Sequence, residues 1–133
     1  MNYFLDTDIC IYLMKGKNRP LLEKFHQFTL TEIAIPTIVL SELKFGVAKS
    51  SRVAANQKRL EAFLAPFQIT PYPEKAAALY GDIRSALEKK GTPIGSNDML
   101  IAAHVLAEGV TLVTNNEREF LRVPDLKVEN WTH

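Results

Sequence analysis

Sulfur and long apolar runs are scarce in this sequence. Cys10 is the only cysteine among 133 residues, which excludes an internal disulfide and a cysteine-rich zinc cluster. We expect its thiol to be a small buried apolar side chain, in keeping with a reducing cytoplasm. No window approaches the ~20 apolar residues of a membrane-spanning helix, and no basic segment followed by an apolar run opens the chain. The sequence therefore predicts a cytoplasmic protein with no membrane segment.

Histidine clusters, strong net charge and several common catalytic motifs are also missing. The three histidines, His26, His104 and His133, lack the spacing of metal ligands, and we expect His104 on a helix surface and His26 partly exposed. The formal net charge of +1 gives no indication for or against nucleic acid. The absence of a Gly-x-Ser-x-Gly elbow, a P-loop and a Gly-x-Gly-x-x-Gly loop argues against acyl transfer and against nucleoside triphosphate or dinucleotide binding.

What is present is an ordinary globular composition, 47% hydrophobic and 23% charged, on a chain whose length suits one domain over residues 1–133. Short apolar runs predict strands at residues 2–5, 33–35, 67–70, 110–114 and 127–128. Periodic segments predict helices at residues 9–14, 20–28, 37–49, 53–65, 73–90 and 97–108. This alternation predicts an α/β fold, a three-layer α/β/α domain with a central, mainly parallel sheet of four to five strands. Ligands of such sheets bind beyond the carboxyl ends of the strands, which is where a site is expected.

Two acidic residues interrupt the apolar start of the chain. Asp6 comes directly after the first predicted strand, so its carboxylate is expected at the carboxyl edge of the sheet. A structural alternative is that Asp6, Thr7 and Asp8 cap the helix that follows, by accepting hydrogen bonds from its free N–H groups. The two roles are compatible.

Glu42 stands among apolar residues of its predicted helix. Its neighbours three and four residues away include Ile38, Val39 and Phe45. An ionised carboxylate in an apolar row is unfavourable unless something positive or hydrogen-bonding meets it. This position indicates a functional carboxylate, and the alternative is a structural ion pair with a lysine or arginine.

Asp98 repeats the pattern in the first turn of a later helix, whose same face continues with Ile101, Ala102 and Val105. Its alternative role is to complement the positive end of the helix dipole. A polar segment, residues 114–120, follows the fourth strand and is expected at the same edge. Several carboxylates there would repel one another and resist ionisation. A divalent cation relieves that repulsion, and all-oxygen ligands favour Mg²⁺ or Mn²⁺ over zinc.

These acidic positions lie in four stretches that resemble one known family. The stretches are FLDTDICIYLMKG at the start, IVLSELKFGVAKS around Glu42, PIGSNDMLIAAHVLAEG around Asp98, and LVTNNEREFLRV further on. Together, over nearly the whole chain, they resemble the PIN-domain ribonucleases, and more narrowly the VapC toxins of type II toxin–antitoxin systems. The resemblance implies the three-layer fold, acidic ligands for Mg²⁺ or Mn²⁺, endoribonuclease activity, a homodimer, and inhibition by a cognate VapB-type antitoxin.

The resemblance also assigns roles to individual positions. Asp6, Glu42 and Asp98 match the acidic motif residues of the family. The fourth position departs from it, because many relatives have Asp where this chain has Asn116, while others place the acid where it has Glu119. We predict Glu119 as the fourth catalytic residue, with Asn116 assisting, and Asp6, Asp98 and Glu119 as metal ligands. Whether one or two metals bind stays open.

Further residues are expected to support the site and to hold RNA. Thr7, Asp8 and Thr114 are predicted to orient the acidic groups. The metal is expected to lower the pKa of a water that attacks the phosphodiester, leaving 5′-phosphate and 3′-hydroxyl ends. Basic residues that follow the first two motifs are candidates for phosphate contacts, with solvated surface charges as the alternative: Lys15, Lys17, Arg19, Lys44, Lys49 and Arg52. Similarity to the enteric-type toxins indicates a tRNA anticodon loop, with initiator tRNA as a candidate.

Two other functions fit part of the pattern. A haloacid-dehalogenase-like phosphatase also opens with a strand ending in Asp-x-Asp, as Asp6–Asp8 does, and its late motif is faintly echoed by residues 95–98. That hypothesis predicts an aspartyl-phosphate on Asp6 and leaves Glu42 without a role. A non-catalytic RNA-binding module that merely holds a metal is the second alternative, and Asn116 is the residue that favours it.

Overall fold

The computed structural model describes residues 1–133 and contains one parallel sheet. Its strands are β1 (Tyr3–Leu5), β2 (Ile33–Pro36), β3 (Gln68–Thr70), β4 (Thr111–Val113) and β5 (Val128–Glu129). All neighbouring strands pair in parallel, in the spatial order β3-β2-β1-β4-β5. The helices are α1 (Thr7–Lys15), α2 (Arg19–Phe25), α3 (Thr37–Ala48), α4 (Val53–Leu64), α5 (Ala76–Lys90), α6 (Ser96–Glu108) and α7 (Glu117–Phe120), and a 3-10 turn, η1, spans Leu30–Glu32.

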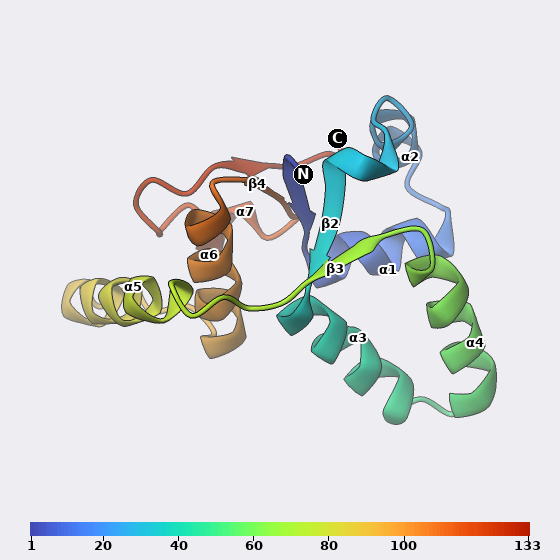
Figure 1. Cartoon of the computed structure of the whole chain (residues 1–133), viewed down its shortest axis with the longest axis horizontal. Coiled ribbons are helices and arrows are strands. Elements are labelled where there is room, and N and C mark those ends of the chain that lie inside the picture. Colours follow the sequence, from blue (N-terminus) through green and yellow to red (C-terminus); the bar gives the residue numbers. More distant parts are fainter.

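Helices cover both faces of the sheet. Figure 1 shows α5 and α6 on one side of the strands and α1, α2 and α4 on the other, while α3 continues away from the end of β2. The predicted three-layer α/β/α fold with a parallel sheet is therefore confirmed. Parallel strands covered on both faces are apolar on both faces, and the side chains of Phe4, Leu5, Ile35 and Leu112 are fully buried. No helix has the length and apolarity needed to cross a membrane.

Local sequence explains where the helices next to the site begin and end. The side chain of Asp6 caps α1 by accepting a hydrogen bond from the backbone N–H of Thr7, and Asn18 caps α2 through the N–H of Leu21. Gly109 ends α6 with a φ of 67°, in the left-handed region that favours glycine. This turn lets the chain enter β4 directly, so the end of β4 comes to lie beside the end of β1.

The structure corrects several details of the predicted elements. The helix expected from Pro73 begins at Ala76, because the Ala76 N–H donates to the Pro73 carbonyl and closes a turn first. Phe28 lies outside α2 and stacks on Trp131, with ring centroids 4.9 Å apart. The short elements η1 and α7 were not predicted, since neither is long enough to show a periodic pattern.

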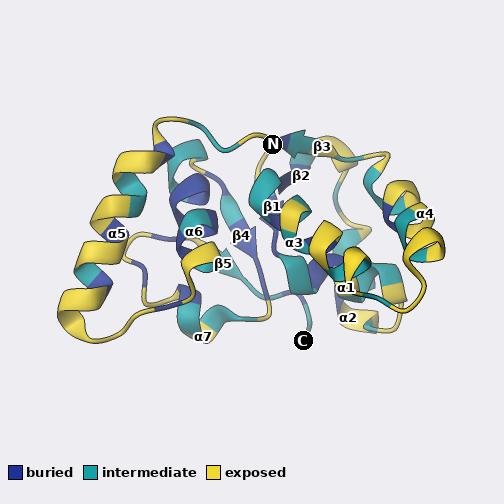
Figure 2. Ribbon diagram, turned by 90° about the horizontal axis from the view of Figure 1, so that it is seen from below, coloured by how far each residue is buried: buried dark blue, intermediate teal, exposed yellow.

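The prediction that His104 lies on a helix surface is wrong, because its side chain is fully buried. The prediction assumed that α6 has one solvent face, whereas α6 is enclosed between the sheet and α5 (Figure 2). The ring of His104 lies edge-on to Phe4 and Tyr72, at centroid distances of 4.9 and 5.7 Å. Neither ring nitrogen has a hydrogen-bond partner. The free thiol of Cys10 is buried, as expected.

Candidate active site

The acidic residues approach one another at the carboxyl edge of the sheet, from four different elements. Asp6 joins β1 to α1. The strand β4 pairs with β1 and leads into the segment that carries Glu119. Glu42 comes from α3, which follows β2, and Asp98 comes from the first turn of α6. Because the strands are parallel, their carboxyl ends meet at the same edge, as the sequence predicts.

Asp6 is the most buried of these carboxylates, with 6% of its surface exposed. Its Oδ1 accepts a hydrogen bond from the backbone N–H of Thr7 at 2.8 Å, and its Oδ2 accepts one from the hydroxyl of Thr114 at 2.6 Å. The helix cap and the placement at the sheet edge therefore coexist in one side chain. The hydroxyl oxygen of Thr114, itself fully buried, also accepts from the backbone N–H of Asn116 at 2.9 Å. Thr114 thus connects Asp6 to the loop after β4.

Glu42 is held by a hydroxyl group and has no ion pair. The hydroxyl of Thr7 donates to Oε1 of Glu42 at 2.6 Å, and no lysine or arginine pairs with this carboxylate. The apolar row that drew attention to Glu42 is only partly a core row, because Val39 is buried whereas Phe45 is 64% exposed. The argument from an apolar surrounding was therefore partly wrong, although the position lies at the acidic edge.

Asn116 and Glu119 interact directly. The side-chain amide of Asn116 donates to Oε2 of Glu119 at 3.1 Å. The one-turn helix α7, which begins at Glu117, brings the side chain of Glu119 back toward Asn116 across three residues. The chain thus places a carboxylate at this point of the edge with a neutral amide as its support.

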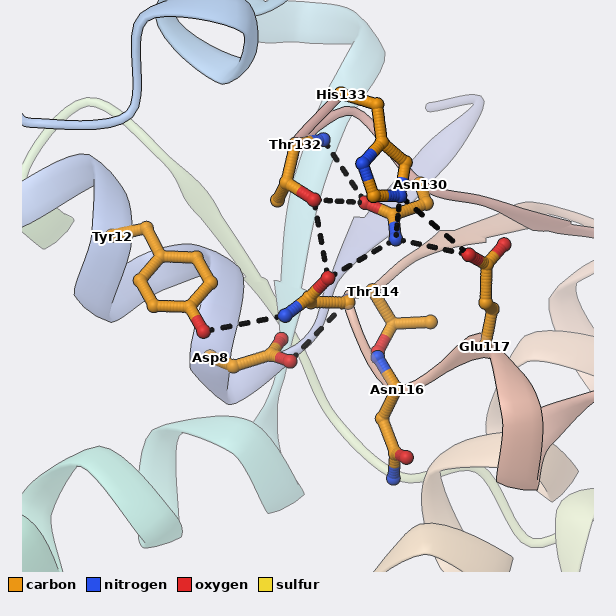
Figure 3. Close-up of polar contacts among 9 residues, drawn as sticks. Asp8, Tyr12, Thr114, Asn116, Glu117, Asn130, Thr132 and His133 are labelled. Carbon is orange, nitrogen blue, oxygen red and sulfur yellow. Dashed lines mark hydrogen bonds and ion pairs between the residues drawn. The ribbon is translucent and has the colours of Figure 1, made fainter.

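A polar network beside the acidic edge was not anticipated. The backbone N–H of Asn115 donates to Oδ2 of Asp8 at 3.3 Å, and the Asn115 side chain lies next to the hydroxyl of Tyr12. The amide of Asn130 and the hydroxyl of Thr132 both donate to Oδ1 of Asn115, each at 3.1 Å. Figure 3 shows this network, which fastens the segment after β5 to the loop after β4. Nothing in the sequence pattern pairs these segments, since their contact depends on β4 and β5 being neighbours.

Burial and mutual repulsion raise the pKa of the carboxyl groups at this edge. Burial raises the pKa of Asp6 to about 7, and repulsion from Asp8 and Asp98 adds to it, while hydrogen bonds from Thr114 and Thr7 oppose it. Burial also raises the pKa of Asp98 to about 6, with further repulsion from Glu42, Glu119 and Asp8. Burial likewise raises the pKa of Asp8, whose Oδ1 is buried without a hydrogen-bond partner.

The donor set is of the kind that binds hard divalent cations. Only carboxylate, amide and hydroxyl oxygens converge, and such oxygens are the ligands of Mg²⁺ and Mn²⁺. No three of the acidic side chains occupy positions from which they hold one ion together, so an ion bound by three of them would need their carboxylates to rotate. Mutual repulsion contributes, after burial, to the raised pKa values of Asp6 and Asp98, and a bound cation would relieve that repulsion.

The predicted RNA-contacting residues are exposed around α1, α3 and the turn before α4. Lys15, Lys17, Lys44, Lys49 and Arg52 are exposed and take part in no ion pair. Lys49 lies over the ring of Phe45, with 5.0 Å from Nζ to the ring centroid. Arg19 differs from the others, since its guanidinium pairs with Glu23 at 2.9 Å.

Comparison with known proteins agrees with this fold. The PIN domain family model matches residues 3–126. The chain is 45% identical to Ribonuclease VapC2 of Rickettsia felis over 137 aligned residues, covering 98% of each chain. The chain belongs to the VapC ribonucleases of the PIN-domain family. It is also 37% identical to the tRNA(fMet)-specific endonuclease VapC of Salmonella typhimurium, with 98% of each chain covered.

A VapC chain in a solved complex has the same fold. The structure of VapBC2 from Rickettsia felis bound to a DNA fragment from their promoter matches with a TM-score of 0.90 and 43% identity. The match covers 98% of this chain and 99% of that one. These relatives give no support to a haloacid-dehalogenase-like phosphatase, whose hypothesis also assigns no role to the Glu42 carboxylate.

Proposed function

We propose that this VapC chain, acting as a single PIN domain over residues 1–133, is a metal-dependent endoribonuclease whose site is the acidic edge of the sheet. The observation that carries the proposal is the convergence of carboxylates there with no cation from the chain to neutralise them. None of them pairs with a lysine or arginine, and the pKa of Asp6 is raised by burial to about 7. A site of this kind is satisfied by a bound cation.

Each acidic residue has a role in this proposal. Asp6, Asp98 and Glu119 would hold Mg²⁺ or Mn²⁺, which when bound acidifies water and stabilises negative charge on a phosphate. Glu42 accepts a proton from the attacking water at Oε2, because its Oε1 is occupied by the Thr7 hydroxyl. Asn116 orients Glu119, because its amide nitrogen Nδ2 donates a hydrogen bond to Oε2 of Glu119 at 3.1 Å.

The supporting residues act through those carboxylates. Thr114 holds Oδ2 of Asp6, and Thr7 holds both Oδ1 of Asp6 and Oε1 of Glu42. Asp8 joins α1 to the loop after β4 through the backbone of Asn115. These contacts fix the reacting groups before the substrate arrives, and such preorganisation is a large part of phosphodiester chemistry in enzymes.

We further propose tRNA as the substrate, with the anticodon loop of initiator tRNA as the first candidate. The support is the likeness to the tRNA(fMet)-specific endonucleases of Salmonella typhimurium and Shigella flexneri, at 37% and 36% identity. Action on tRNA places the chain in the cytoplasm. The exposed lysines and Arg52 would contact the RNA backbone, positioning it without reading its sequence.

A VapB-type antitoxin is the proposed partner, since the related solved structures are VapBC complexes. A homodimer is also proposed. Aromatic side chains on the surface are the candidates for its interface: Phe45 is exposed, whereas Phe63 is half-buried against Phe67, with ring centroids 5.2 Å apart. Phe63 is therefore a poor candidate, and size-exclusion chromatography of Phe45→Glu against wild type tests the contribution of Phe45.

The decisive test is cleavage of purified total tRNA in Mg²⁺, comparing wild type with Asp6→Asn and Asp98→Asn. Asp82→Asn, on the exposed surface of α5, is the matched control. We expect discrete fragments with 5′-phosphate ends from wild type and the control, and none from the two site variants or in EDTA.

The other outcomes contradict specific parts of the proposal. Cleavage by both site variants at the wild-type rate would place the activity elsewhere. Equal RNA binding by all four proteins with no cleavage by any would favour a non-catalytic RNA-binding module. A stable aspartyl-phosphate on Asp6 would reinstate the phosphatase.

A further inference from the structure

A groove of about 340 Å³ lies between α1, α3 and α4 and includes Glu42 of the acidic edge in its lining. Apolar side chains of all three helices form its walls, among them Met14, Val47 and Leu60. Glu42 lines it from α3, and Lys15 and Arg59 line it from α1 and α4. Its volume falls in the range of about 300–1,000 Å³ that is usual for small-molecule sites. The groove is therefore large enough for one nucleotide and continuous with the proposed catalytic carboxylate.

Gly46 leaves part of the groove without a side chain. This glycine lies inside α3, where a glycine is less favourable than alanine by about 1 kcal/mol. No atom of the chain lies within 4 Å of the position that a Cβ on Gly46 would take. Packing within the chain therefore does not require a glycine here. A bare backbone facing a groove permits close approach by a ligand.

The polar groups of the groove suit a ligand with a negative charge and a polar edge. Neither Lys15 nor Arg59 has an ion-pair partner in the chain. The amide nitrogen of Asn56 donates to the hydroxyl of Ser50 at 3.0 Å, while its oxygen takes part in no hydrogen bond. The oxygen is thus free to accept from a donor on a base edge. Aliphatic walls offer an apolar surface to the face of an unstacked base, and a guanidinium binds phosphate through charge-assisted hydrogen bonds.

We infer that this groove binds one unstacked nucleotide of single-stranded RNA, next to the phosphodiester that the acidic edge cleaves. Its base lies over Gly46 between the apolar walls, and its flanking phosphates are met by Lys15 and Arg59. The inference rests on the proposed ribonuclease function, because RNA at the acidic edge must pass Glu42. An acidic protein segment would satisfy the same two cations. RNA is favoured because the Glu42 carboxylate lines the groove, and the RNA backbone has to reach that carboxylate to be cleaved. The unpaired bases of an RNA loop are also free to splay out into a groove.

The first experiment leaves the protein unchanged and alters the RNA. A synthetic initiator-tRNA anticodon stem–loop is prepared with one abasic nucleotide at each loop position in turn. Binding is measured by fluorescence anisotropy in Mg²⁺ with Asp98→Asn protein, so that no cleavage interferes. We expect one loop position at which loss of the base weakens binding by roughly tenfold, the scale of one packed base. A uniform response at all loop positions would overturn the inference.

The second experiment fills the groove. Gly46→Leu places a side chain in it, and Gly81→Leu makes the same change inside α5, where a Cβ also meets no atom within 4 Å. Both changes favour the helix, so circular dichroism should show folded proteins of at least wild-type stability. In the Asp98→Asn background, we expect Gly46→Leu to bind the intact stem–loop roughly tenfold more weakly and to lose the response to the sensitive abasic position. Gly81→Leu should behave as its parent.

Two further measurements separate this inference from its rival and from the proposed function. Equal RNA binding by Gly46→Leu and Gly81→Leu would overturn the inference that the groove binds a nucleotide. If in that case Gly46→Leu alone captures a cognate VapB-type antitoxin more weakly, the groove binds a protein segment instead. The Mn²⁺ affinity of Gly46→Leu in the Asp98-containing protein, measured by calorimetry, should equal that of wild type. If wild type cleaves no RNA, the proposed function fails, while the binding experiments still decide the groove.

Discussion

Replacing Asp98 with asparagine should stabilise the metal-free protein at alkaline pH while abolishing cleavage. Burial is the largest cause of the raised pKa of Asp98, and repulsion from Glu42, Glu119 and Asp8 adds to it. Folding therefore brings an ionised carboxylate into an unfavourable place. Asparagine has nearly the same shape and no charge, so it removes this unfavourable interaction and leaves the packing of α6 in place.

The size and sign of the effect follow from the two pKa values of Asp98. Folding raises its pKa from the ordinary 3.8 to about 6, which corresponds to at most about 3 kcal/mol at about 1.4 kcal/mol per pKa unit. Solvent screens this half-buried group, so we expect about 1–2 kcal/mol. The folded state binds the proton more tightly, so wild-type stability is full below pH 3.8 and falls as the pH rises toward 6. The advantage of Asp98→Asn thus appears across that window and is constant above it.

The assay is thermal unfolding in EDTA at about pH 3, below the ordinary pKa of Asp98, and at about pH 8, for wild type, Asp98→Asn and Asp82→Asn. For a chain of this length, the expected advantage corresponds to a midpoint about 3–10 °C higher at the alkaline pH. At the acidic pH the difference should nearly vanish. Asp82 is exposed on α5, away from the cluster, so Asp82→Asn should match wild type at both values.

Adding Mg²⁺ at the alkaline pH provides an internal check. The cation should raise the unfolding temperature of wild type, because it binds the folded site alone, and should raise that of Asp98→Asn much less. An equal or lower stability of metal-free Asp98→Asn at alkaline pH would refute the reasoning that the carboxylates repel one another in the folded state.

Three other changes test separate contacts. Thr7→Val removes the hydroxyl that donates to Glu42 and should lower kcat roughly ten- to hundredfold with little change in KM; Thr7→Ser should restore it. His104→Leu should stabilise the protein by about 1–3 kcal/mol, because both ring nitrogens are buried without hydrogen-bond partners and the nearest carboxylate, that of Glu108, is 4.0 Å from Nε2. Burial lowers the pKa of the folded-state His104 below 6.5, so the stability of the wild type falls as the pH drops below 6.5. Denaturant unfolding should therefore show a larger gain in stability from His104→Leu at acidic than at alkaline pH. Asn116→Asp replaces the donor to Glu119 with another carboxylate; calorimetry should show tighter Mn²⁺ binding, and metal-free unfolding at alkaline pH should show lower stability.

The sequence allows the sheet and the position of the acidic edge to be predicted because both follow from local patterns. Apolar runs that alternate with periodic segments require parallel strands with helical crossovers. A carboxylate directly after a strand, such as Asp6, or in the first turn of a helix, such as Asp98, then has to lie near the carboxyl edge. These inferences need only the positions of residues along their own elements.

The errors arise where a residue's surroundings depend on several elements at once. His104 was placed on a surface because amphipathic helices usually have one, whereas α6 is covered by the sheet on one side and by α5 on the other. The sequence predicts a positive or hydrogen-bonding partner for Glu42 but not which one: it is the hydroxyl of Thr7, on a different helix, and the alternative of a lysine or arginine is wrong. The contact between Asn115 and Asn130 exists only because β4 and β5 are neighbours in the sheet.

The hydrogen bonds at the acidic edge orient its carboxylates without neutralising them. The donors to its carboxylates are the Thr7 backbone and hydroxyl, the Thr114 hydroxyl, the Asn115 backbone and the Asn116 amide. All of these groups are neutral, so they fix the directions of the carboxylates without cancelling their charge. A lysine or arginine in the same places would offset the negative charge of these carboxylates and would also occupy the position of a cation. Orientation by neutral donors therefore preserves the electrostatic repulsion that a metal ion would relieve. The same repulsion that lowers the stability of the metal-free chain would favour the binding of a cation.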